Sequence, residues 1–394
     1  MNASLRMQMV QSPIIPIVGQ LLRDHPGSVS LGQGVVHYDP PPQALQAVHS
    51  FLAEGRQHKY QPVEGIEPLQ ERIRRKLAAE NRLADLERSA VVVTAGGNMA
   101  FFNALLAIAD AGDEIVLISP YYFNHEMAVS MLGCRSVIVP ATRDYQLDVD
   151  AICRATTART RAIVTVSPNN PTGAVYGEQS LREVNAWCAE QGIYHVSDEA
   201  YEYFVYDRAE HFSPGSIPAA ADHTISLYSL SKAYALASWR LGYMTLPAGL
   251  LTAIKKAQDT ILICPPVVSQ YAACGALDAG IEFCRPRVAA LARVRQLVTG
   301  RLAELRDVAA IGQADGAFYV LIDVRTSLGQ LPLVERLVRD FGVAAIPGET
   351  FGLSSGCFLR ISYGALEEES VAEAIDRLVR GVRTLAQEFP RCTS

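Results

Sequence analysis

The 394-residue sequence lacks the features that mark several large classes of protein. Its eight cysteines form no C-x-x-C pair, which argues against a disulfide framework or a zinc site and favours free thiols in a reducing compartment. No apolar run reaches the ~18 residues of a membrane span, and the first residues carry no apolar signal-peptide core. A net charge of −6 offers no basic surface for nucleic acid or an anionic membrane. These absences predict a cytoplasmic globular protein with no metal, membrane or nucleic-acid partner.

Repeats, low-complexity segments and the G-x-x-x-x-G-K-[ST] sequence of a nucleotide P-loop are also missing. What is present is an ordinary globular composition, 49% hydrophobic and 19% charged, over a length that suggests two or three domains. The central part alternates short apolar runs with amphipathic stretches such as Ser180–Gln191. The apolar runs predict buried strands at Val91–Val93, Glu114–Ile118, Ala162–Val166, Ile193–Val196 and Ile225–Tyr228. This alternation predicts an α/β fold in which a mostly parallel sheet lies between helices.

The two ends of the chain follow a different pattern. Residues 1–45 are rich in proline and glycine and are expected to be extended. After them and the central part, we expect a long helix around Pro286–Leu305, an apolar run at Phe318–Ile322, a helix near Leu333–Asp340 and an apolar run at Cys357–Ile361. We therefore predict a large domain over residues 46–285 and a smaller α+β domain built from residues 1–45 and 286–394.

A lysine and an arginine follow the last predicted strand of the large domain. Lys232 lies in Tyr228-Ser229-Leu230-Ser231-Lys232, and Arg240 comes eight residues later. A lysine with an ordinary pKa is unprotonated in about one molecule in ~2,500 at pH 7. Burial or neighbouring positive charge lowers that pKa and makes the amine a nucleophile. A solvated loop lysine is the ordinary alternative, so the interpretation of Lys232 depends on the other clusters.

Polar residues also follow two earlier strands, at the edge of the sheet where ligands collect in parallel folds. Asp198 ends an apolar run, and a carboxylate there needs a cationic partner, such as a protonated pyridine nitrogen, unless it caps a helix. Tyr201 either donates a hydrogen bond to a phenolic oxygen of such a pyridine ligand or packs as an ordinary aromatic side chain. Asn170 precedes Pro171 and Gly173 in a rigid turn that can fix its amide against the same oxygen.

Groups suited to an anion and a flat ring complete the pattern. Backbone N–H groups at Gly97 and Asn98, where a predicted helix over Met99–Ile108 opens, suit a phosphate. Ser229, Ser231 and Arg240 add side-chain donors. Tyr121 and Tyr122 follow another strand end, where one of them can stack on a heteroaromatic ring or pack in the core. Arg360 is a lone charge in an apolar run and needs an anion, either a substrate carboxylate or an internal salt bridge.

Three motifs occur in order, separated by strand–helix units: Asn170-Pro171-Thr172-Gly173, Asp198-Glu199-Ala200-Tyr201, and Ser229-Leu230-Ser231-Lys232 with Arg240. Together they resemble the fold type I pyridoxal 5′-phosphate (PLP) enzymes, specifically the class I/II aminotransferases of the aspartate, aromatic and kynurenine branches. The resemblance extends from Leu31 to Arg360 and implies a large domain with a mostly parallel, mixed sheet between helices. It implies transfer of an amino group between an L-amino acid and a 2-oxo acid by a ping-pong mechanism, through a Schiff base on Lys232.

The resemblance also implies roles for single residues. Lys232, Asp198 and Tyr201 are the expected catalytic residues: Lys232 carries the cofactor, Asp198 pairs with its ring nitrogen, and Tyr201 and Asn170 hold its phenolic oxygen. His125 is expected to support Asp198. Residues that contact the rest of the cofactor are expected to be Gly97, Asn98, Ser229, Ser231 and Arg240 around the phosphate and Tyr122 on the ring.

Substrate binding and assembly are implied in the same way. Arg360, helped by Gly34 and Asn170, resembles the clamp on the substrate's α-carboxylate. Tyr60 resembles the tyrosine that reaches the phosphate of the neighbouring subunit, which implies a homodimer with shared active sites. The stretch Val35–Tyr38 departs from the family pattern near the side-chain pocket, and no second arginine is found for a distal carboxylate. Isoleucines 14, 15 and 17, if they line that pocket, favour apolar or aromatic substrates.

Three alternatives remain at the level of the sequence. A PLP-dependent lyase or cyclase of the same fold would have the same lysine and aspartate, although the turn at Asn170 and the arginine at Arg360 favour transamination. A transcription regulator with an aminotransferase-like domain would need an added basic DNA-binding domain, for which the resemblance from about residue 31 leaves no room. An inactive scaffold is disfavoured because every expected cofactor contact is present.

Overall fold

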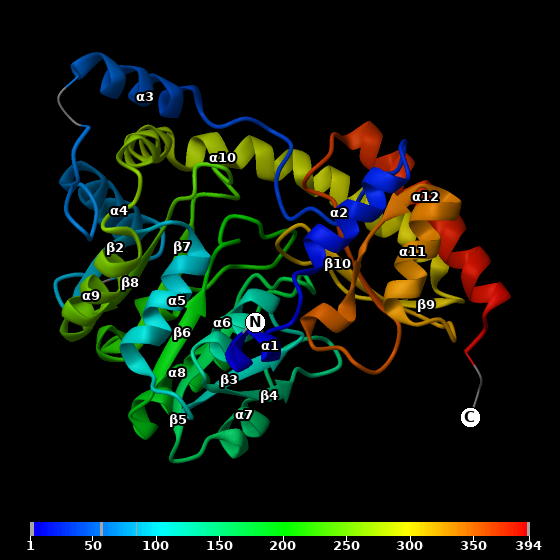
Figure 1. Ribbon diagram of the computed structural model, residues 1–394, viewed down its shortest axis with the longest axis horizontal. Helices are drawn as coiled ribbons and strands as arrows, with labels where there is room; N and C mark the ends of the chain where they lie inside the picture. Colours follow the sequence, from blue (N-terminus) through cyan, green and yellow to red (C-terminus); the bar gives the residue numbers. More distant parts are fainter. Residues whose placement is uncertain (1–3, 56–57, 84, 392–394) are drawn as a thin grey trace.

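A seven-stranded sheet forms the centre of the large lobe in the computed structural model, which describes residues 4–55, 58–83 and 85–391. Its strands lie in the order β2-β8-β7-β6-β5-β3-β4. Their bounds are Ser89–Thr94 (β2), Glu114–Ser119 (β3), Arg135–Pro140 (β4), Thr160–Val166 (β5), Tyr194–Asp198 (β6), Thr224–Ser229 (β7) and Gly242–Pro247 (β8). Only β8 runs antiparallel to its neighbours. The predicted mostly parallel sheet is confirmed, and all five predicted strands are present (Figure 1).

Helices cover both faces of this sheet because successive strand residues point to opposite sides. Ile115 and Leu117 of β3 pack in one apolar cluster, towards α5 (Gly97–Ile108), α6 (Phe123–Met131) and α9 (Leu251–Leu262). Val116 and Ile118 pack in another, towards α7 (Val149–Ala155) and α8 (Glu178–Gln191). A strand buried on both faces reads as a continuous apolar run, which is why β3 was visible in the sequence.

The smaller lobe is built around an antiparallel sheet in the order β12-β13-β10-β9. Its strands are Ala309–Ile311 (β9), Tyr319–Val324 (β10), Ile346–Pro347 (β12) and Phe358–Ser362 (β13). Helices α11 (Gln330–Phe341) and α12 (Glu368–Glu388) pack against each other beside it (Figure 1). Strand β1 (Val29–Ser30) pairs with β11 (Val343–Ala344), so the N-terminal part of the chain joins this lobe.

One long helix connects the lobes. Helix α10 (Val267–Leu302) lies beside α3 (Pro42–Glu54) and α4 (Glu67–Ala79) and reaches α12 (Figure 1). Gly280 breaks its helical geometry with φ 59° and ψ −158°, a conformation that is essentially confined to glycine. At Gly275 a Cβ would lie 2.1 Å from the carbonyl oxygen of Gln43, so glycine permits the close contact with α3. The helix therefore begins well before residue 286, where the sequence suggested, and the domain boundary at 285/286 stays a prediction.

The expectation of an extended N-terminal segment was wrong. Helices α1 (Leu5–Met9) and α2 (Ile14–Asp24) form there. Pro13 caps α2 and Pro16 lies in its first turn, where backbone N–H groups have no helical acceptor and proline is tolerated. Ile14 and Val18, one turn apart, are buried and anchor the helix. Across the described ranges, no helix combines the length and apolarity needed to cross a membrane.

Candidate active site

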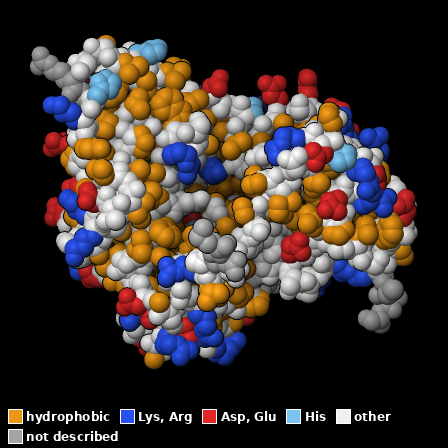
Figure 2. Space-filling model, in the orientation of Figure 1, with side chains coloured by type: hydrophobic (Ala, Val, Ile, Leu, Met, Phe, Trp, Pro, Cys, Tyr) orange, Lys and Arg blue, Asp and Glu red, His pale blue; other side chains and the backbone are white. Residues whose placement is uncertain are grey.

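A cavity of about 140 Å³ opens at the carboxyl ends of β5, β6 and β7. Figure 2 shows a hollow between the two lobes on the face in view, with basic side chains beside it. The cavity brings together most of the predicted residues, and its lining is Gly97, Asn98, Tyr122, Val166, Asn170, Asp198, Ala200, Tyr201, Ser229, Ser231, Lys232 and Arg240. Residues far apart in sequence meet here because the carboxyl ends of parallel strands share one edge of the sheet.

Lys232 follows β7 and points into this cavity. Its Nζ donates a hydrogen bond to the carbonyl oxygen of Gly34 at 2.6 Å. Burial, with the positive charges of Arg360 and Arg240, lowers the pKa of Lys232 from 10.5 to about 8, and the negative charge of Asp198 partly offsets this. At pH 7 about one amine in ten is then unprotonated, against one in thousands for a solvated lysine. Burial and neighbouring positive charge are the surroundings that an activated amine requires.

Asp198 ends β6 and faces His125 of α6. The distance from His125 Nε2 to Asp198 Oδ2 is 3.1 Å, and the backbone N–H of Ala200 donates to Asp198 Oδ1 at 3.1 Å. His125 is buried and its ring stacks on Phe101, with 4.0 Å between centroids. Tyr122 meets the same imidazole edge-on. The carboxylate is therefore held by the N–H of Ala200 and by the imidazole of His125, and the expected contact with His125 is present.

Arg360 lies on β13 in the smaller lobe and does not itself line the cavity, but it contacts the lining residue Asn170. Its Nη1 donates to Asn170 Oδ1 at 2.9 Å, and its Nη2 to the carbonyl oxygen of Gly32 at 2.6 Å. Although the side chain is buried, its Nε has no hydrogen-bond partner among the described residues. No carboxylate is among its contacts in that part of the chain, so the guanidinium is free to receive one. The carbonyl that contacts Arg360 belongs to Gly32, whereas Gly34 contacts Lys232.

The corner opposite Asp198 is rich in hydrogen-bond donors. Gly97 and Asn98 are the first residues of α5, so their N–H groups face the cavity's end without helical acceptors. Arg240 lies beside them, donating to the carbonyl oxygen of Ala237 at 3.0 Å. A Cβ at Gly96 would lie 2.5 Å from Arg240 Nη2, and Gly96 has φ 84°, so both space and backbone favour glycine. Ser229 and Ser231 complete this corner.

Tyr319, which the sequence did not single out, also belongs to this site. It begins β10, is fully buried, and its hydroxyl lies 2.7 Å from the hydroxyl of Tyr201. Its ring lies under the guanidinium of Arg360, 4.6 Å from centroid to Cζ. Nothing in the run Phe318–Ile322 separates this tyrosine from an ordinary core aromatic, because its contacts come from three other segments of the chain.

Several predicted positions lie outside the cavity. Tyr60 is 78% exposed and lines a different hollow with Phe51, Val267 and Val268. Isoleucines 14, 15 and 17 are not among the residues that line the cavity, and Ile14 belongs to the core. In the stretch Val35–Tyr38, the Tyr38 hydroxyl donates to the carbonyl oxygen of Ala233 at 3.1 Å, beside Lys232.

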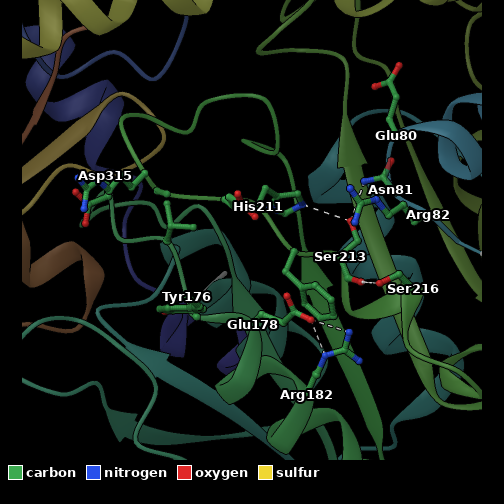
Figure 3. A pocket seen from close by; sticks show the side chains of 16 residues that line it. Glu80, Asn81, Arg82, Tyr176, Glu178, Arg182, His211, Ser213, Ser216 and Asp315 are labelled. Carbon is green, nitrogen blue, oxygen red and sulfur yellow. Dashed lines mark hydrogen bonds and ion pairs between the residues drawn. The ribbon is translucent and has the colours of Figure 1, made fainter.

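A second polar hollow, of about 620 Å³, is lined by residues that include His211 and Ser213 (Figure 3), and both of these contact Glu199, the residue after Asp198. Side chains of consecutive residues in extended chain point to opposite sides, so Glu199 faces away from Asp198. Its buried Oε2 accepts from Ser213 at 2.5 Å and contacts His211 Nε2 at 2.9 Å. Near the rim, Arg182 pairs with Glu178 at 2.7 Å. These charges are paired with one another, in contrast to those around Lys232. No cluster of potential metal ligands occurs within the described ranges.

Comparison with known proteins identifies a consistent set of relatives. The family model described as aminotransferase class I and II matches residues 26–378. An aromatic aminotransferase of Arabidopsis thaliana is 33% identical, over 95% of this chain and 94% of its own. The aspartate/prephenate aminotransferase of Thermus thermophilus is 35% identical over 92% of both chains. The solved structure of T. thermophilus aspartate aminotransferase with maleate has a TM-score of 0.88 at 34% identity, covering 97% of this chain and 100% of that one.

Proposed function

The chain belongs to the class I and II aminotransferases, and we propose that it prefers amino acids with aromatic or apolar side chains and acts as a cytoplasmic homodimer. Transamination between amino acids and 2-oxo acids with PLP is the chemistry of this family. The relatives therefore favour transamination over the lyase or cyclase alternative. The observation that carries the assignment to this site is the placement of Lys232 in the cavity with Arg360 close behind it: Arg360 contacts the lining residue Asn170, and its charge helps to lower the pKa of Lys232.

The residues around the cavity fit PLP in three respects. A phosphate fits the corner of Gly97, Asn98 and Arg240, where N–H groups and a guanidinium converge on a position that only glycine at 96 leaves open. A protonated ring nitrogen suits Asp198, whose carboxylate otherwise accepts a hydrogen bond from Ala200 and contacts the ring of His125. Between these ends lies the amine of Lys232. The remaining contacts assigned to the cofactor are Tyr122, Asn170, Tyr201, Ser229 and Ser231.

When bound, the cofactor draws electrons away from the substrate's Cα and makes its proton removable. Lys232 carries the cofactor, and its freed amine then takes and returns that proton. A pKa of about 8 suits this work near neutral pH, since a base is most effective when its pKa lies close to the working pH. Arg360, with the amide of Asn170, binds the α-carboxylate and so orients the Cα–H bond towards Lys232. Gly34, whose carbonyl oxygen accepts a hydrogen bond from Lys232, is proposed to assist in binding the substrate.

The preference for aromatic or apolar side chains rests on the surroundings of Arg360. Tyr319 and Phe351 lie on the guanidinium, at 4.6 and 5.1 Å from ring centroid to Cζ. Phe351 also packs near Phe123, with 5.8 Å between centroids. These rings surround the arginine proposed to bind the substrate carboxylate with aromatic surface, which supports a preference for aromatic or apolar side chains. The Arabidopsis relative is named as an aromatic aminotransferase, whereas the Thermus relative acts on aspartate and prephenate.

A panel of amino donors with 2-oxoglutarate and pyruvate tests this function. We expect phenylalanine and tyrosine to donate with the highest kcat/KM, and double-reciprocal plots to be parallel, as a ping-pong cycle requires. Aspartate is the matched comparison, because it differs in carrying a second carboxylate. Release of ammonia without amino-group transfer would exclude the aminotransferase assignment. A higher kcat/KM for aspartate than for phenylalanine would overturn the substrate preference alone.

The homodimer is proposed from the surface around Tyr60. Leu45, Leu52, Tyr60, Ile261 and Ile263 are all exposed, which is unusual for large apolar side chains in one region of a monomer. We propose that a second copy covers them and that Tyr60 reaches the phosphate corner of that copy. Cytoplasmic location is supported by the free thiols of Cys134, Cys153, Cys188, Cys264, Cys274, Cys284 and Cys357, while Cys392 lies outside the described residues.

Complementation between two inactive variants tests the shared site. Chains with Tyr60→Ala and chains with Lys232→Ala are co-expressed, so that mixed dimers form. If the sites are shared, one site in each mixed dimer carries both changes and the other neither, and activity returns. Co-expression of Lys232→Ala with Asp198→Ala, both in the same chain's cavity, is the control that distinguishes sharing from chain exchange. Recovery in neither mixture would argue against a contribution of Tyr60 in trans.

A further inference from the structure

Tyr319 contacts four parts of the site at once, although it belongs to the smaller lobe. Its hydroxyl lies 2.7 Å from that of Tyr201, and its ring lies against Arg360. A Cβ at Gly34 would lie 2.6 Å from the Tyr319 hydroxyl, so that oxygen is pressed against the backbone that holds Lys232. Its carbonyl oxygen would lie 2.5 Å from a Cβ at Gly173, in the turn that carries Asn170. A residue at this junction has more than a packing role.

The hydroxyl groups of Tyr201 and Tyr319 carry one proton each, and only one of these protons can lie between the two oxygens. Burial raises the pKa of Tyr319 to about 12 and that of Tyr201 well above 10, so both hydroxyls stay protonated at neutral pH. Among the described residues, the hydroxyl of Tyr319 has a hydrogen bond to Tyr201 and to no other group. If Tyr201 donates its proton to the cofactor's phenolic oxygen, the proton between the two phenols must come from Tyr319. The second hydroxyl thereby strengthens the first as a donor, since linked hydrogen bonds polarise one another.

The ring of Tyr319 has a separate task. Arg360 is buried, and its guanidinium lies on the faces of Tyr319 and Phe351. A cation over the face of a desolvated aromatic ring is stabilised by the negative charge of that face. Asn170 and Gly32 accept hydrogen bonds from the two terminal nitrogens of the guanidinium, and the two rings restrict the orientation of its plane. The Nε of Arg360 has no hydrogen-bond partner among the described residues, so none of them competes with a substrate carboxylate for it.

We propose that Tyr319 is a positioning residue with two separable functions: its hydroxyl directs the proton of Tyr201 towards the cofactor, and its ring orients Arg360 for the substrate carboxylate. The inference rests on the proposed function, because the roles of Tyr201 and Arg360 are assigned there. It adds a residue of the smaller lobe that couples cofactor binding and substrate binding through one side chain. Removing the hydroxyl and removing the ring should therefore have different effects.

Two substitutions separate these functions. Tyr319→Phe removes the hydroxyl and keeps the ring, whereas Tyr319→Leu removes both. The first readout is the pH midpoint at which the visible absorbance of the bound cofactor changes. The second is the Kd for 3-phenylpropionate, an unreactive carboxylate, measured from the same absorbance. Tyr363→Phe is the matched control, because Tyr363 is equally buried but, among the described residues, its ring contacts neither Tyr201 nor Arg360 as that of Tyr319 does.

We expect Tyr319→Phe to raise the pH midpoint by roughly 0.3 to 1 unit. A weaker donor at Tyr201 leaves more negative charge on the cofactor's phenolic oxygen, which then holds a neighbouring proton more tightly. Its Kd for 3-phenylpropionate should stay within about twofold of the wild-type value. Tyr319→Leu should show the same rise in midpoint and bind 3-phenylpropionate roughly tenfold more weakly, as loss of a cation–π contact predicts. Tyr363→Phe should change neither value.

An unchanged midpoint in Tyr319→Phe overturns the role of the hydroxyl, and an unchanged Kd in Tyr319→Leu overturns the role of the ring. Gly34→Ala tests the hydroxyl independently should a Tyr319 variant not fold. Its added Cβ would displace the hydroxyl from Tyr201 and should also raise the midpoint. Failure of the proposed function looks different, because wild-type protein would then lack a visible chromophore and transfer no amino group.

Discussion

Buried charges are fully paired at one edge of the seven-stranded sheet and incompletely paired at the other. At the amino edge, the fully buried carboxylate of Glu114, at the start of β3, accepts hydrogen bonds from Thr157, Arg135 and Arg159 at 2.6 to 2.7 Å. At the carboxyl edge, the amine of Lys232 has a single carbonyl partner among the described residues, and Arg360 keeps an unpartnered Nε.

The difference explains how one sheet supplies both stability and chemistry. Glu114 links the first residues of β3, β4 and β5, because its partners lie at the start of β4 and just before β5. Its negative charge is compensated by two arginines. The charges at the carboxyl edge are desolvated without full compensation, which costs stability but leaves them free to bind and react. Substitutions at the two edges should therefore have opposite consequences for activity and for folding.

The largest effect is expected at Lys232. Lys232→Ala should lower turnover by at least about 10⁴-fold and remove the adduct trapped by borohydride, because no other amine takes its place. The unfolding free energy of the cofactor-free protein, measured in urea, should stay equal or rise by up to about 1 kcal/mol, since a desolvated amine is lost. A variant that still forms the borohydride adduct would refute the assignment of this lysine.

Arg360 should come second. Arg360→Ala removes the partner of the substrate carboxylate, and kcat/KM should fall roughly 10²- to 10³-fold, or about 3–4 kcal/mol of transition-state binding. Arg161→Ala is a suitable control, because this arginine pairs with Asp113 at the amino edge and is half exposed. If both variants keep wild-type kcat/KM, Arg360 is structural and the distinction between the edges fails.

At the amino edge the expected loss is in stability. Glu114→Ala should lower the free energy of unfolding by about 3 kcal/mol, roughly one for each partner lost, with kcat and KM unchanged. Hydrogen bonds from Thr157 and the two arginines lower the pKa of Glu114 from 4.5 to about 2. Because the folded pKa is depressed, this stabilisation is complete above pH 4.5 and is lost as the pH falls towards 2. Urea titrations at pH 7 and pH 3 test both statements, and a variant equally destabilised at the two values would contradict the second.

A smaller effect is expected from His195, which lies at the opposite end of β6 from Asp198. Its Nδ1 accepts from Asn185 Nδ2 at 3.1 Å and its Nε2 contacts Thr165 Oγ1 at 2.9 Å, so the imidazole is neutral. Burial, with the charge of His223, lowers its pKa from 6.5 to about 3. The unfolded chain binds this proton below pH 6.5 and the fold does not, so stability falls as the pH drops through that window. The loss at pH 5 is about 2 kcal/mol, at 1.36 kcal/mol per pH unit.

Replacing His195 isolates this term. His195→Gln should be less stable at pH 7.5 but should lose less stability between pH 6.5 and pH 5 than the wild-type protein. His58→Gln is the matched control, because that histidine lies on the surface hollow near Tyr60. Equal slopes in the wild-type protein and His195→Gln would mean that another group titrates in this window.

Elements with a strong local signal were accessible from the sequence. Strands buried on both faces, such as β3 and β5, appear as unbroken apolar runs, and the polar residues that follow them mark the ligand-binding edge. Strand β4 was overlooked because it lies at the edge of the sheet and carries exposed positions such as Arg135. Helix α2 was overlooked because its prolines resemble those of an extended segment, and only the burial of Ile14 and Val18 shows their place in a first turn.

Contacts between distant segments could not be obtained in this way. His125 and Asp198 are 73 positions apart and meet because α6 follows β3, which lies two strands from β6. Tyr319 looks like any core aromatic until β10 places it beside Tyr201. Gly32 and Gly34 are only two positions apart, so the sequence could not show which of them contacts Arg360. In the fold, the carbonyl oxygen of Gly32 contacts Arg360 and that of Gly34 contacts Lys232.

The sequence alone indicated the family and the cofactor and predicted the nucleophile, because all three depend on residue types at strand ends, whose order and spacing can be seen without coordinates. The tertiary structure decided the ionisation of Lys232, the pairing of Asp198 with His125 and the entry of Tyr319 into the site. Desolvation and hydrogen-bond direction depend on what surrounds a group in space, and the nearest groups here come from both lobes. Order along the chain specifies which groups are available, whereas packing sets their charge and geometry.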